Sequence, residues 1–293
     1  MLTIIIPALN EARNLARLLP HLQAVCPQAE VIVTDGGSRD DTQGVVSRFP
    51  RVRLVLSERG RARQMNAGAR VARGDVFLFL HADTFLPPGT QVAIRKALAD
   101  PGVVCGRFDV RFDNPRPIFR MIATMMNLRS RLSGIFTGDQ AIFVKRQVFE
   151  VLGGYPEISL MEDVELSRLL KRKGRAMCLH LEVGTSARRW ERDGILRTIL
   201  LMWTLRLLYF VGVNPHRLHR WYYGNGTDTA GPHGSLVALG DQRRGRRTAV
   251  TGLNAAGVSR LSSLGVGEGR RDVERLGVAP ELAVAAKVAP LAG

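Results

Sequence analysis

Short apolar runs alternate with amphipathic segments along the first part of the chain. Runs of strand length, each bounded by turn residues, predict strands at 2–6, 31–34, 52–56 and 76–80. Helical spacing of apolar residues predicts helices at 42–48 and 61–71, and a further helix that begins at Asn10 or Glu11 and that Pro20 should end. This β–α alternation predicts an α/β fold with a mostly parallel central sheet flanked by helices.

The second part of the chain continues in the same way, with longer helices. Strands are predicted at 103–112, 141–144 and 176–181, and helices at 91–99, 117–132, 146–152 and 161–172. The helix at 117–132 has an apolar face that we expect to pack on the core, made of Ile118, Met121, Ile122, Met125 and Leu128. Its arginines lie mostly away from that face. A basic loop is expected at 186–192.

Residues 195–211 form the most apolar long segment, but Arg197 and Arg206 interrupt it. An Arg at the centre of a bilayer costs roughly 3 kcal/mol, so a spanning helix is not expected. A buried helix or one that lies on a membrane surface fits better. After Tyr223 the composition shifts to Gly, Ser, Ala, Thr and Arg, and we predict a poorly ordered tail at 224–293.

The strand near residue 78 is the most informative single stretch. Five consecutive apolar residues predict a strand that is buried on both faces, and His81 and Asp83 follow it directly. In open α/β sheets, ligands bind at the carboxyl ends of the strands. His81 and Asp83 are therefore either a metal-capable pair or part of a turn in which Asp83 caps the next helix. The stretch alone favours neither interpretation.

The charge of the chain adds an expectation about partners. The formal net charge is +16, and only five of the 42 basic residues are Lys. This excess points to an anionic partner such as phosphate, nucleic acid or a membrane surface, although compositional bias toward Arg explains part of it. The three Cys residues are isolated, as in a reducing compartment, and the first residues do not resemble a signal peptide.

The chain lacks several common cofactor and catalytic motifs, and its candidate site residues are instead a set of acids. The chain has no GxGxxG after its first strand, no GxxxxGK[ST] and no GxSxG, which disfavours nicotinamide, P-loop and serine-hydrolase sites. Asp35, Asp83 and Asp163 stand near strand ends. One or two carboxylates together with substrate phosphates commonly hold Mg²⁺, and Asp83 fits that role. Arg61 and Arg63 could contact phosphates at a helix start.

Taken in order, these motifs resemble family 2 glycosyltransferases of the GT-A fold, in particular the short soluble bacterial type. The resemblance covers about residues 1–223. The matching motifs lie at 7–11, 35–38, 63–68, 81–83, 137–140, 153–157 and 162–166. It implies a nucleotide-binding half at 1–89, an acceptor half at 90–194 and C-terminal apolar helices at 195–223.

The resemblance also implies roles for individual residues. Asp163 would be the catalytic base, at a helix start that favours its ionised form, and Asp83 would bind a Mg or Mn ion on the donor diphosphate. His81 replaces the first Asp of the family's Asp-x-Asp motif, so its role stays open, and we expect His81→Asp to preserve activity. The substrate-binding residues implied by the pattern and the resemblance are Pro7, Ala8, Asn10, Glu11, Asp35, Gly36, Arg61, Arg63, Asn66, His81, Ala82, Gly138, Asp139, Glu162, Arg188, Arg189 and Trp190.

The leading hypothesis is a metal-assisted, inverting glycosyltransferase that uses a nucleotide diphosphate sugar, expected to be UDP-linked, and an unassigned acceptor that can be lipid-linked. We expect a cytoplasmic protein with peripheral contact at the inner membrane face through 195–211, and no nucleic-acid partner. Two alternatives stay open: a nucleotidyltransferase, and a basic protein that binds nucleic acid or a membrane surface.

Overall fold

The computed structural model describes residues 1–223, all of which fall in one compact unit. The tail predicted at 224–293 lies outside the described residues. The division of 1–223 into two halves and C-terminal helices stays a prediction.

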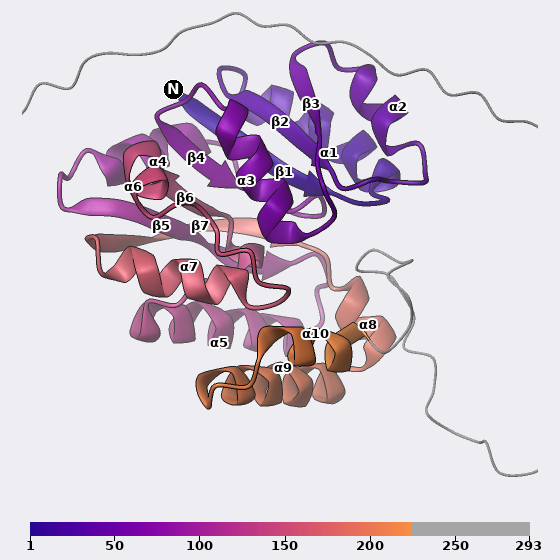
Figure 1. The fold of residues 1–293 in the computed structure, drawn as a ribbon, viewed down its shortest axis with the longest axis vertical. Helices are drawn as coiled ribbons and strands as arrows, with labels where there is room; N and C mark the ends of the chain where they lie inside the picture. The colour runs from indigo at the N-terminus through magenta and orange to yellow at the C-terminus, as the bar shows by residue number, and fades with distance from the viewer. Residues whose placement is uncertain (224–293) are drawn as a thin grey trace, which may run out of the picture. The chain divides into compact units, whose positions relative to one another are not determined.

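The described region alternates strands and helices as the periodicity predicts (Figure 1). The strands are β1 (Leu2–Ala8), β2 (Glu30–Asp35), β3 (Val52–Leu56), β4 (Val76–Phe79), β5 (Val103–Phe112), β6 (Ile142–Lys145) and β7 (Arg175–Thr185). The helices are α1 (Ala12–Val25), α2 (Thr42–Ser47), α3 (Arg61–Val71), α4 (Thr90–Leu98), α5 (Pro117–Ser133), the 3-10 turn η1 (Gly138–Gln140), α6 (Arg146–Val151), α7 (Glu162–Lys171), α8 (Arg188–Asp193), α9 (Ile195–Phe210) and α10 (Pro215–Tyr223).

The seven strands of this region form one sheet in the order β3-β2-β1-β4-β6-β5-β7. β6 runs antiparallel to both of its neighbours, and every other pairing is parallel, which confirms the mostly parallel sheet. Pro7 is tolerated in a central strand because it lies beyond Ile5, where the pairing of β1 with β4 ends.

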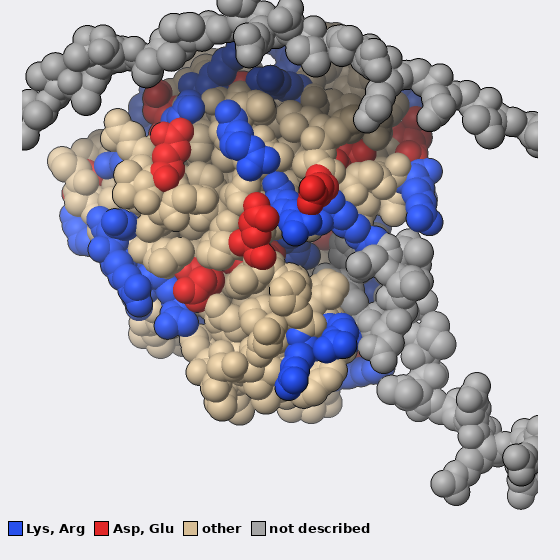
Figure 2. Space-filling model, in the orientation of Figure 1, with Lys and Arg blue, Asp and Glu red and all other residues tan. Residues whose placement is uncertain are grey.

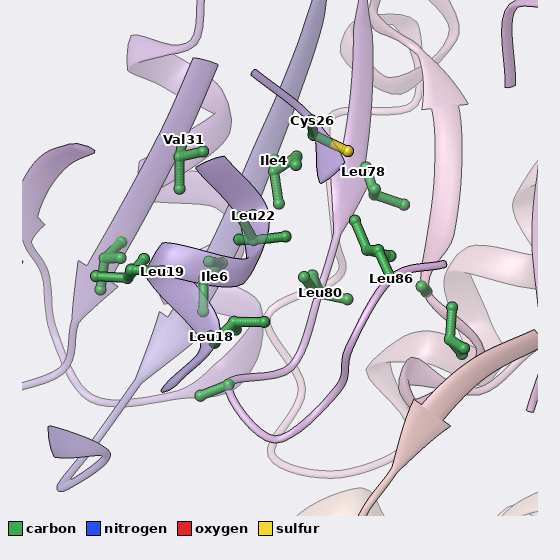
Figure 3. Packing of buried hydrophobic residues seen from close by; sticks show 14 of the residues in the cluster. Ile4, Ile6, Leu18, Leu19, Leu22, Cys26, Val31, Leu78, Leu80 and Leu86 are labelled. Atoms are coloured by element: carbon green, nitrogen blue, oxygen red, sulfur yellow. The ribbon is translucent and has the colours of Figure 1, made fainter. Parts of the chain in front are cut away.

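Alternate strand residues build separate cores on the two faces of the sheet. On one face, Ile4 and Leu78 pack with Leu18 and Leu22 of α1, as Figure 3 shows, and α2 and α4 join the same cluster. On the other face, Ile5 and its neighbours pack with α3, α6 and α7. The sheet is therefore covered by helices on both sides, and its strand ends are left to form the site.

Pro20 does not end the first helix, contrary to the sequence prediction. α1 continues through Pro20 to Val25. Pro20 removes the hydrogen bond to the carbonyl of Ala16, but both residues are exposed, so water can satisfy that group. Leu22, two residues further on, is fully buried in the core, and its packing favours continuation of the helix.

The orientation of α5 and the basic loop after β7 also differ from expectation. α5 buries Phe119, Ile122 and Ala123, whereas Met121, Met125 and Leu128 of the predicted core face are exposed. The helix is rotated because part of its arginine-bearing side turns inward toward buried acids. The segment predicted as a basic loop contains the short helix α8.

Gly68 allows α3 to approach the sheet closely. A Cβ at position 68 would stand 2.5 Å from Cγ2 of Ile5 and 3.0 Å from Cγ2 of Thr34. We expect Gly68→Ala to lower the free energy of unfolding by about 1–3 kcal/mol, because overpacking forces the helix away from β1 and β2. Chemical denaturation measures this change. Arg70→Ala, at an exposed position on the same helix, is the control and should change it by less than about 0.5 kcal/mol. Equal effects of the two substitutions would contradict the packing argument.

Candidate active site

The reversed direction of β6 brings two loops together. β6 pairs with β4 so that Phe79 lies opposite Ile142. Because the strands are antiparallel, the residues that follow Phe79 lie beside those that precede Ile142. The His81–Asp83 loop therefore lies beside Thr137 and η1. This is the carboxyl end of β1 and β4, where ligands bind in sheets of this kind.

His81 and Asp139 form the contact between these loops. His81 Nδ1 lies 3.6 Å from Asp139 Oδ1, and the histidine side chain is 18% exposed. Burial acts to lower the pKa of His81, but the interaction with Asp139 and the charge of Asp83 outweigh it, so the pKa is raised. Burial acts to raise the pKa of Asp139, but His81 outweighs it and the pKa is lowered. Each partner thus favours the charged form of the other.

Asp163 is fixed by the same loop. Its Oδ2 accepts a hydrogen bond from the backbone N–H of Gly138 at 2.9 Å, and its Oδ1 accepts one from its neighbour Val164 at 2.8 Å. The side chain is half-buried at the start of α7. These contacts orient a carboxylate toward the loop that also holds Asp139.

Glu162 is buried and pairs with a cation from another part of the chain. Arg61 Nη1 lies 3.4 Å from Glu162 Oε1. Burial raises the pKa of Glu162, and Arg61 opposes that shift. Arg61 also acts electrostatically on His81 and Asp139. The predicted residues 61, 81, 139, 162 and 163 are therefore brought together.

Asp83 ends the loop that follows β4 and is half-buried beside the hydroxyl of Thr84. Among the described residues no group of three His, Cys, Asp or Glu side chains is placed to hold a metal ion. A cation at Asp83 would need further oxygen ligands from a substrate. A hard cation such as Mg²⁺ is commonly held by one or two carboxylates together with phosphate oxygens, so Asp83 fits this mode of binding.

The polar groups of the turn after β1 are bonded to the loop after β2. Asn10 adopts φ 57°, its N–H donates to Ser38 Oγ at 2.8 Å, and its Oδ1 accepts from Arg39 N–H at 2.8 Å. Glu11 is buried, and burial raises its pKa although a hydrogen bond from Asn14 opposes the shift. This turn lies beside the end of β4, because the charges of His81 and Asp83 act on Glu11.

Asp35 is fully buried and its oxygens are already occupied. They accept hydrogen bonds from Ser38 N–H and from Gln43 Nε2, the latter at 2.7 Å. Gly36 is packed against Gln64, whose Nε2 donates to the carbonyl of Ala8 at 2.7 Å. In this structure Asp35 shapes the loop at the end of β2, and its proposed contact with a base or ribose stays a prediction.

The basic segment after β7 divides into three different environments. Arg188 donates from Nη2 to Asn14 Oδ1 at 3.1 Å, which ties α8 to α1 beside Glu11. Arg189 lies 4.4 Å from the ring centroid of Tyr222. Its charge also acts on Asp139, which faces the site. Trp190 instead packs edge-on against Phe112 in an apolar cluster, so the structure gives it a packing contact.

Two other predicted residues make structural contacts. Asn66 bonds both backbone groups of Tyr155, at 2.9 and 2.8 Å, and so joins α3 to the loop before α7. Arg63 pairs at the surface with Glu58, at 2.5 Å, and with Glu157. Pro7 and Ala8 end β1, and Ala82 is buried between His81 and Asp83. None of these contacts tests a role in substrate binding.

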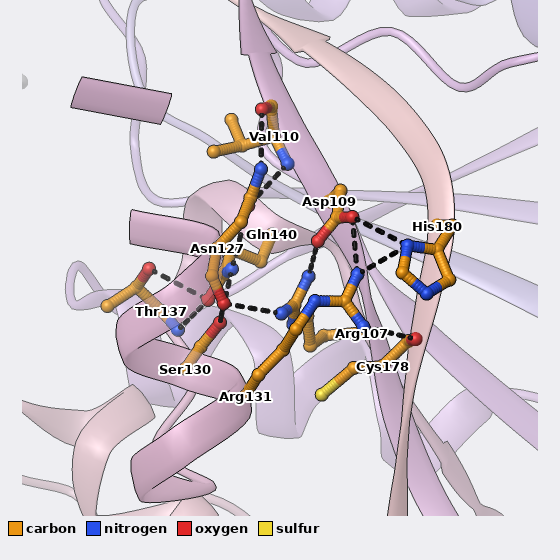
Figure 4. Close-up of polar contacts among 10 residues, drawn as sticks. All are labelled: Arg107, Asp109, Val110, Asn127, Ser130, Arg131, Thr137, Gln140, Cys178 and His180. Atoms are coloured by element: carbon orange, nitrogen blue, oxygen red, sulfur yellow. Dashed lines mark hydrogen bonds and ion pairs between the residues drawn. The ribbon is translucent and has the colours of Figure 1, made fainter. Parts of the chain in front are cut away.

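Arg129 was not predicted as a site residue. Its Nε and Nη2 are buried without a hydrogen-bond partner, and Asp163 and Asp139 act on its charge. Burial lowers the pKa of Arg129, and these two acids oppose the shift. In contrast, the neighbouring Arg131 pairs with Asp109 and with the carbonyl of Cys178, as Figure 4 shows. Both arginines are turned toward the protein interior because of the rotation of α5, and the periodicity of the sequence did not indicate that rotation.

The same network fixes η1 to α5. Gln140 donates from Nε2 to Ser130 Oγ at 2.9 Å, and Thr137 and Gln140 cap the turn (Figure 4). A hollow of about 1010 Å³ lies elsewhere, at the amino ends of β1 and β4 beside Met1, Asp75 and Lys145. Because that is the opposite end of these strands, it is not the candidate site.

An α/β sheet with acids after β4 and at the start of α7 is the arrangement expected of a GT-A glycosyltransferase, and comparisons with solved structures show the same fold. The mannosyltransferase PcManGT from Pyrobaculum calidifontis, in complex with GDP-Man and Mn²⁺, matches with a TM-score of 0.53 and 26% identity over 66% of this chain and 60% of that one. S. aureus TarS shares the fold with a TM-score of 0.54 and 18% identity over 64% of this chain and 61% of that one.

The chain belongs to glycosyltransferase family 2, whose model "Glycosyl transferase family 2" matches residues 3–153. An undecaprenyl-phosphate 4-deoxy-4-formamido-L-arabinose transferase of Pseudomonas syringae is 34% identical over 29% of each chain. A PGL/p-HBAD biosynthesis glycosyltransferase of Mycobacterium bovis is 30% identical over 53% of this chain and 63% of the relative. The chain thus matches less than two thirds of the length of either relative. It is a glycosyltransferase by family, as the sequence predicted.

The His81–Asp139 pair gives a prediction about pH. A raised His pKa means that the pair stabilises the protein fully below the usual value of 6.5, and that this contribution is lost as pH rises through the raised pKa. On the acid side it is lost as pH falls below 3.8 through the lowered pKa of Asp139. We therefore expect His81→Gln to be less stable than wild type between about pH 4 and 6.5, with the difference shrinking at higher pH.

Urea unfolding at a series of pH values measures this difference, with the exposed His216→Gln as control. A difference that does not change with pH would contradict the ion pair. The pair also reverses the expectation for His81→Asp. A carboxylate at position 81 would face both Asp139 and Asp83, so we now expect that substitution to weaken activity.

Proposed function

We propose that this glycosyltransferase moves a sugar from a nucleoside diphosphate donor to an acceptor hydroxyl, with inversion at the sugar carbon. The observation that carries the proposal is the meeting of Asp83, the His81–Asp139 pair and Asp163 at one end of the sheet. PcManGT, which is 26% identical to this chain, is seen in complex with GDP-Man and Mn²⁺. That complex supports a nucleotide sugar as donor and a metal ion as cofactor here. The resemblance in sequence favours UDP as the nucleotide, so UDP and GDP donors are compared in the test below.

The proposed chemistry assigns a separate task to each side of the site. The acceptor hydroxyl attacks the anomeric carbon while Asp163 takes its proton, and the bond from that carbon to the diphosphate oxygen breaks. Asp83 would hold Mg²⁺ or Mn²⁺ together with the donor phosphates, and the metal would stabilise the charge that develops on the leaving diphosphate. Arg61 and Arg189 add positive charge close to Asp139.

Partly buried polar contacts hold this arrangement together. Asp163 is bonded to Gly138, and Asp139 to His81, so the base and the loop after β4 are held through one short turn. A base held in one orientation loses little entropy when the acceptor binds. Arg129 has two buried donors beside these acids, and we propose that they contact substrate oxygens.

For the acceptor, we propose a lipid-linked molecule. The name of the Pseudomonas syringae relative includes undecaprenyl phosphate, and this supports the class of acceptor. A lipid-linked acceptor would require the enzyme to work at a membrane face, which matches the expected peripheral contact through residues 195–211. A cytoplasmic location at the inner membrane face remains part of the proposal.

Asp163→Asn and Asp83→Asn separate the two sides of the site. With UDP- and GDP-sugars and Mn²⁺, we expect Asp163→Asn to bind nucleotide within about twofold of wild type but to release nucleoside diphosphate about 10²–10⁴ times more slowly. In wild type, removal of the metal ion by a chelator should weaken nucleotide binding. Asp83→Asn should weaken nucleotide binding to the same extent, and a chelator should then have no further effect. Calorimetry measures binding, and a coupled assay measures release.

The exposed Asp41→Asn is the control and should leave both quantities unchanged. Undiminished turnover in Asp163→Asn would refute its role as base. Release of pyrophosphate from a nucleoside triphosphate would instead support the nucleotidyltransferase alternative.

A further inference from the structure

The outer face of α9 carries a continuous row of exposed apolar side chains. Leu196, Leu200, Trp203, Leu207 and Phe210 are each 58–75% exposed. Their spacing of four, three, four and three residues places them on one side of the helix over about 21 Å. Monomeric proteins rarely leave such contiguous apolar surface in water, so this face is expected to meet an apolar partner.

A second exposed row lies on α5, the helix next to α9. Met121, Met125, Leu128 and Leu132 are 50–80% exposed and again follow one side of a helix. The two helices share an apolar cluster through Ile118 and Met126 of α5 and Ile195 and Ile199 of α9, and Figure 1 draws them next to each other. The two rows, with the exposed Trp221 of α10, make up what we call the α5–α9 surface.

The charge around this surface is mostly positive. The sequences of α5, α9 and α10 contain no Asp or Glu. Exposed arginines accompany the apolar rows at positions 116, 120, 197, 217 and 220. The adjoining α8 carries two acids: Asp193 is engaged by Arg192 and Arg189, and the exposed Glu191 accepts a hydrogen bond from Asn114 at the edge of the surface. In Figure 2 the region over α9 and α10 shows Lys or Arg among uncharged residues and no Asp or Glu on this face.

Apolar rows flanked by exposed arginines favour one kind of partner over another. A second copy of the chain would bring like-charged arginines together around the apolar rows, which costs energy. An anionic lipid surface complements both features, because acyl chains accept the apolar row and headgroups pair with the arginines. Trp203 and Trp221 are of the type enriched at membrane–water interfaces. No helix of residues 1–223 is long and apolar enough to cross a membrane, so α9 would lie in the surface plane.

We infer that the α5–α9 surface docks the protein on an anionic lipid bilayer. The inner side of α9 supports a link to the site, since Leu205 packs with Met161 and Val164, on either side of Asp163. About one helix diameter, roughly 10 Å, then separates the docked face from the neighbourhood of Asp163. Only this last link, to a lipid-linked acceptor, rests on the proposed function. The docking itself does not.

Vesicle co-sedimentation of the full chain tests the inference without any turnover. We expect binding to phosphatidylcholine vesicles that contain phosphatidylglycerol, weaker binding without it, and weaker binding at high salt. Leu200→Gln/Leu207→Gln leaves the charge unchanged and removes apolar contact, so we expect binding about tenfold weaker or more. The matched control is Val92→Gln/Val151→Gln, which changes equally exposed residues on α4 and α6.

Three results would overturn the inference. The first is the absence of binding to the anionic vesicles, and the second is equal binding by the two double variants. The third is a dimer in solution that dissociates in Leu200→Gln/Leu207→Gln but not in Val92→Gln/Val151→Gln. Because all four positions are exposed, both variants should unfold at the temperature of wild type, which circular dichroism checks. Loss of sugar transfer by Asp163→Asn with retained vesicle binding would show that docking and catalysis are separable.

Discussion

The antiparallel pairing of β6 with β4 is the constraint on which the candidate site depends. A parallel strand at that position would place the Thr137–Gln140 turn at the far end of the sheet from His81. Because β6 is reversed, the turn meets the loop after β4, and His81 and Asp163 both bond to it. The pairing also accounts for the buried charges, because groups from distant parts of the chain must neutralise one another where the loops meet.

Much of the fold follows from local pattern, and the failures have physical causes. Strand and helix positions agree closely with the periodicity, and β5 and β3 have the predicted bounds. Pro20 misleads because core packing of Leu22 outweighs one lost hydrogen bond at an exposed position. The direction of β6 has no local signal, since an apolar run of four residues reads the same in either orientation.

The site shows a similar division. The positions of Asp83 and Asp163 at element ends were visible in the sequence, whereas the partner of His81 depends on the register between β4 and β6. Arg129 was placed mostly away from the core face because Ile118, Met121, Ile122, Met125 and Leu128 were expected to form that face. In the structure Ile118 and Ile122 do pack on the core, but Met121, Met125 and Leu128 are exposed and Arg129 turns inward. Hydrophobicity therefore predicted the helix and part of its buried face, but not the direction in which that face is centred.

α9 shows why its periodicity was ambiguous. A helix with a single buried face has a polar opposite face, and residues 195–211 have none. The inner residues pack with α7 and α10, and the outer row is equally apolar. An apolar outer row adds nothing to the stability of the isolated fold, because side chains that stay in water gain no burial energy. An explanation of that row must therefore come from something the helix meets after folding, and the arginines that flank it favour an anionic partner.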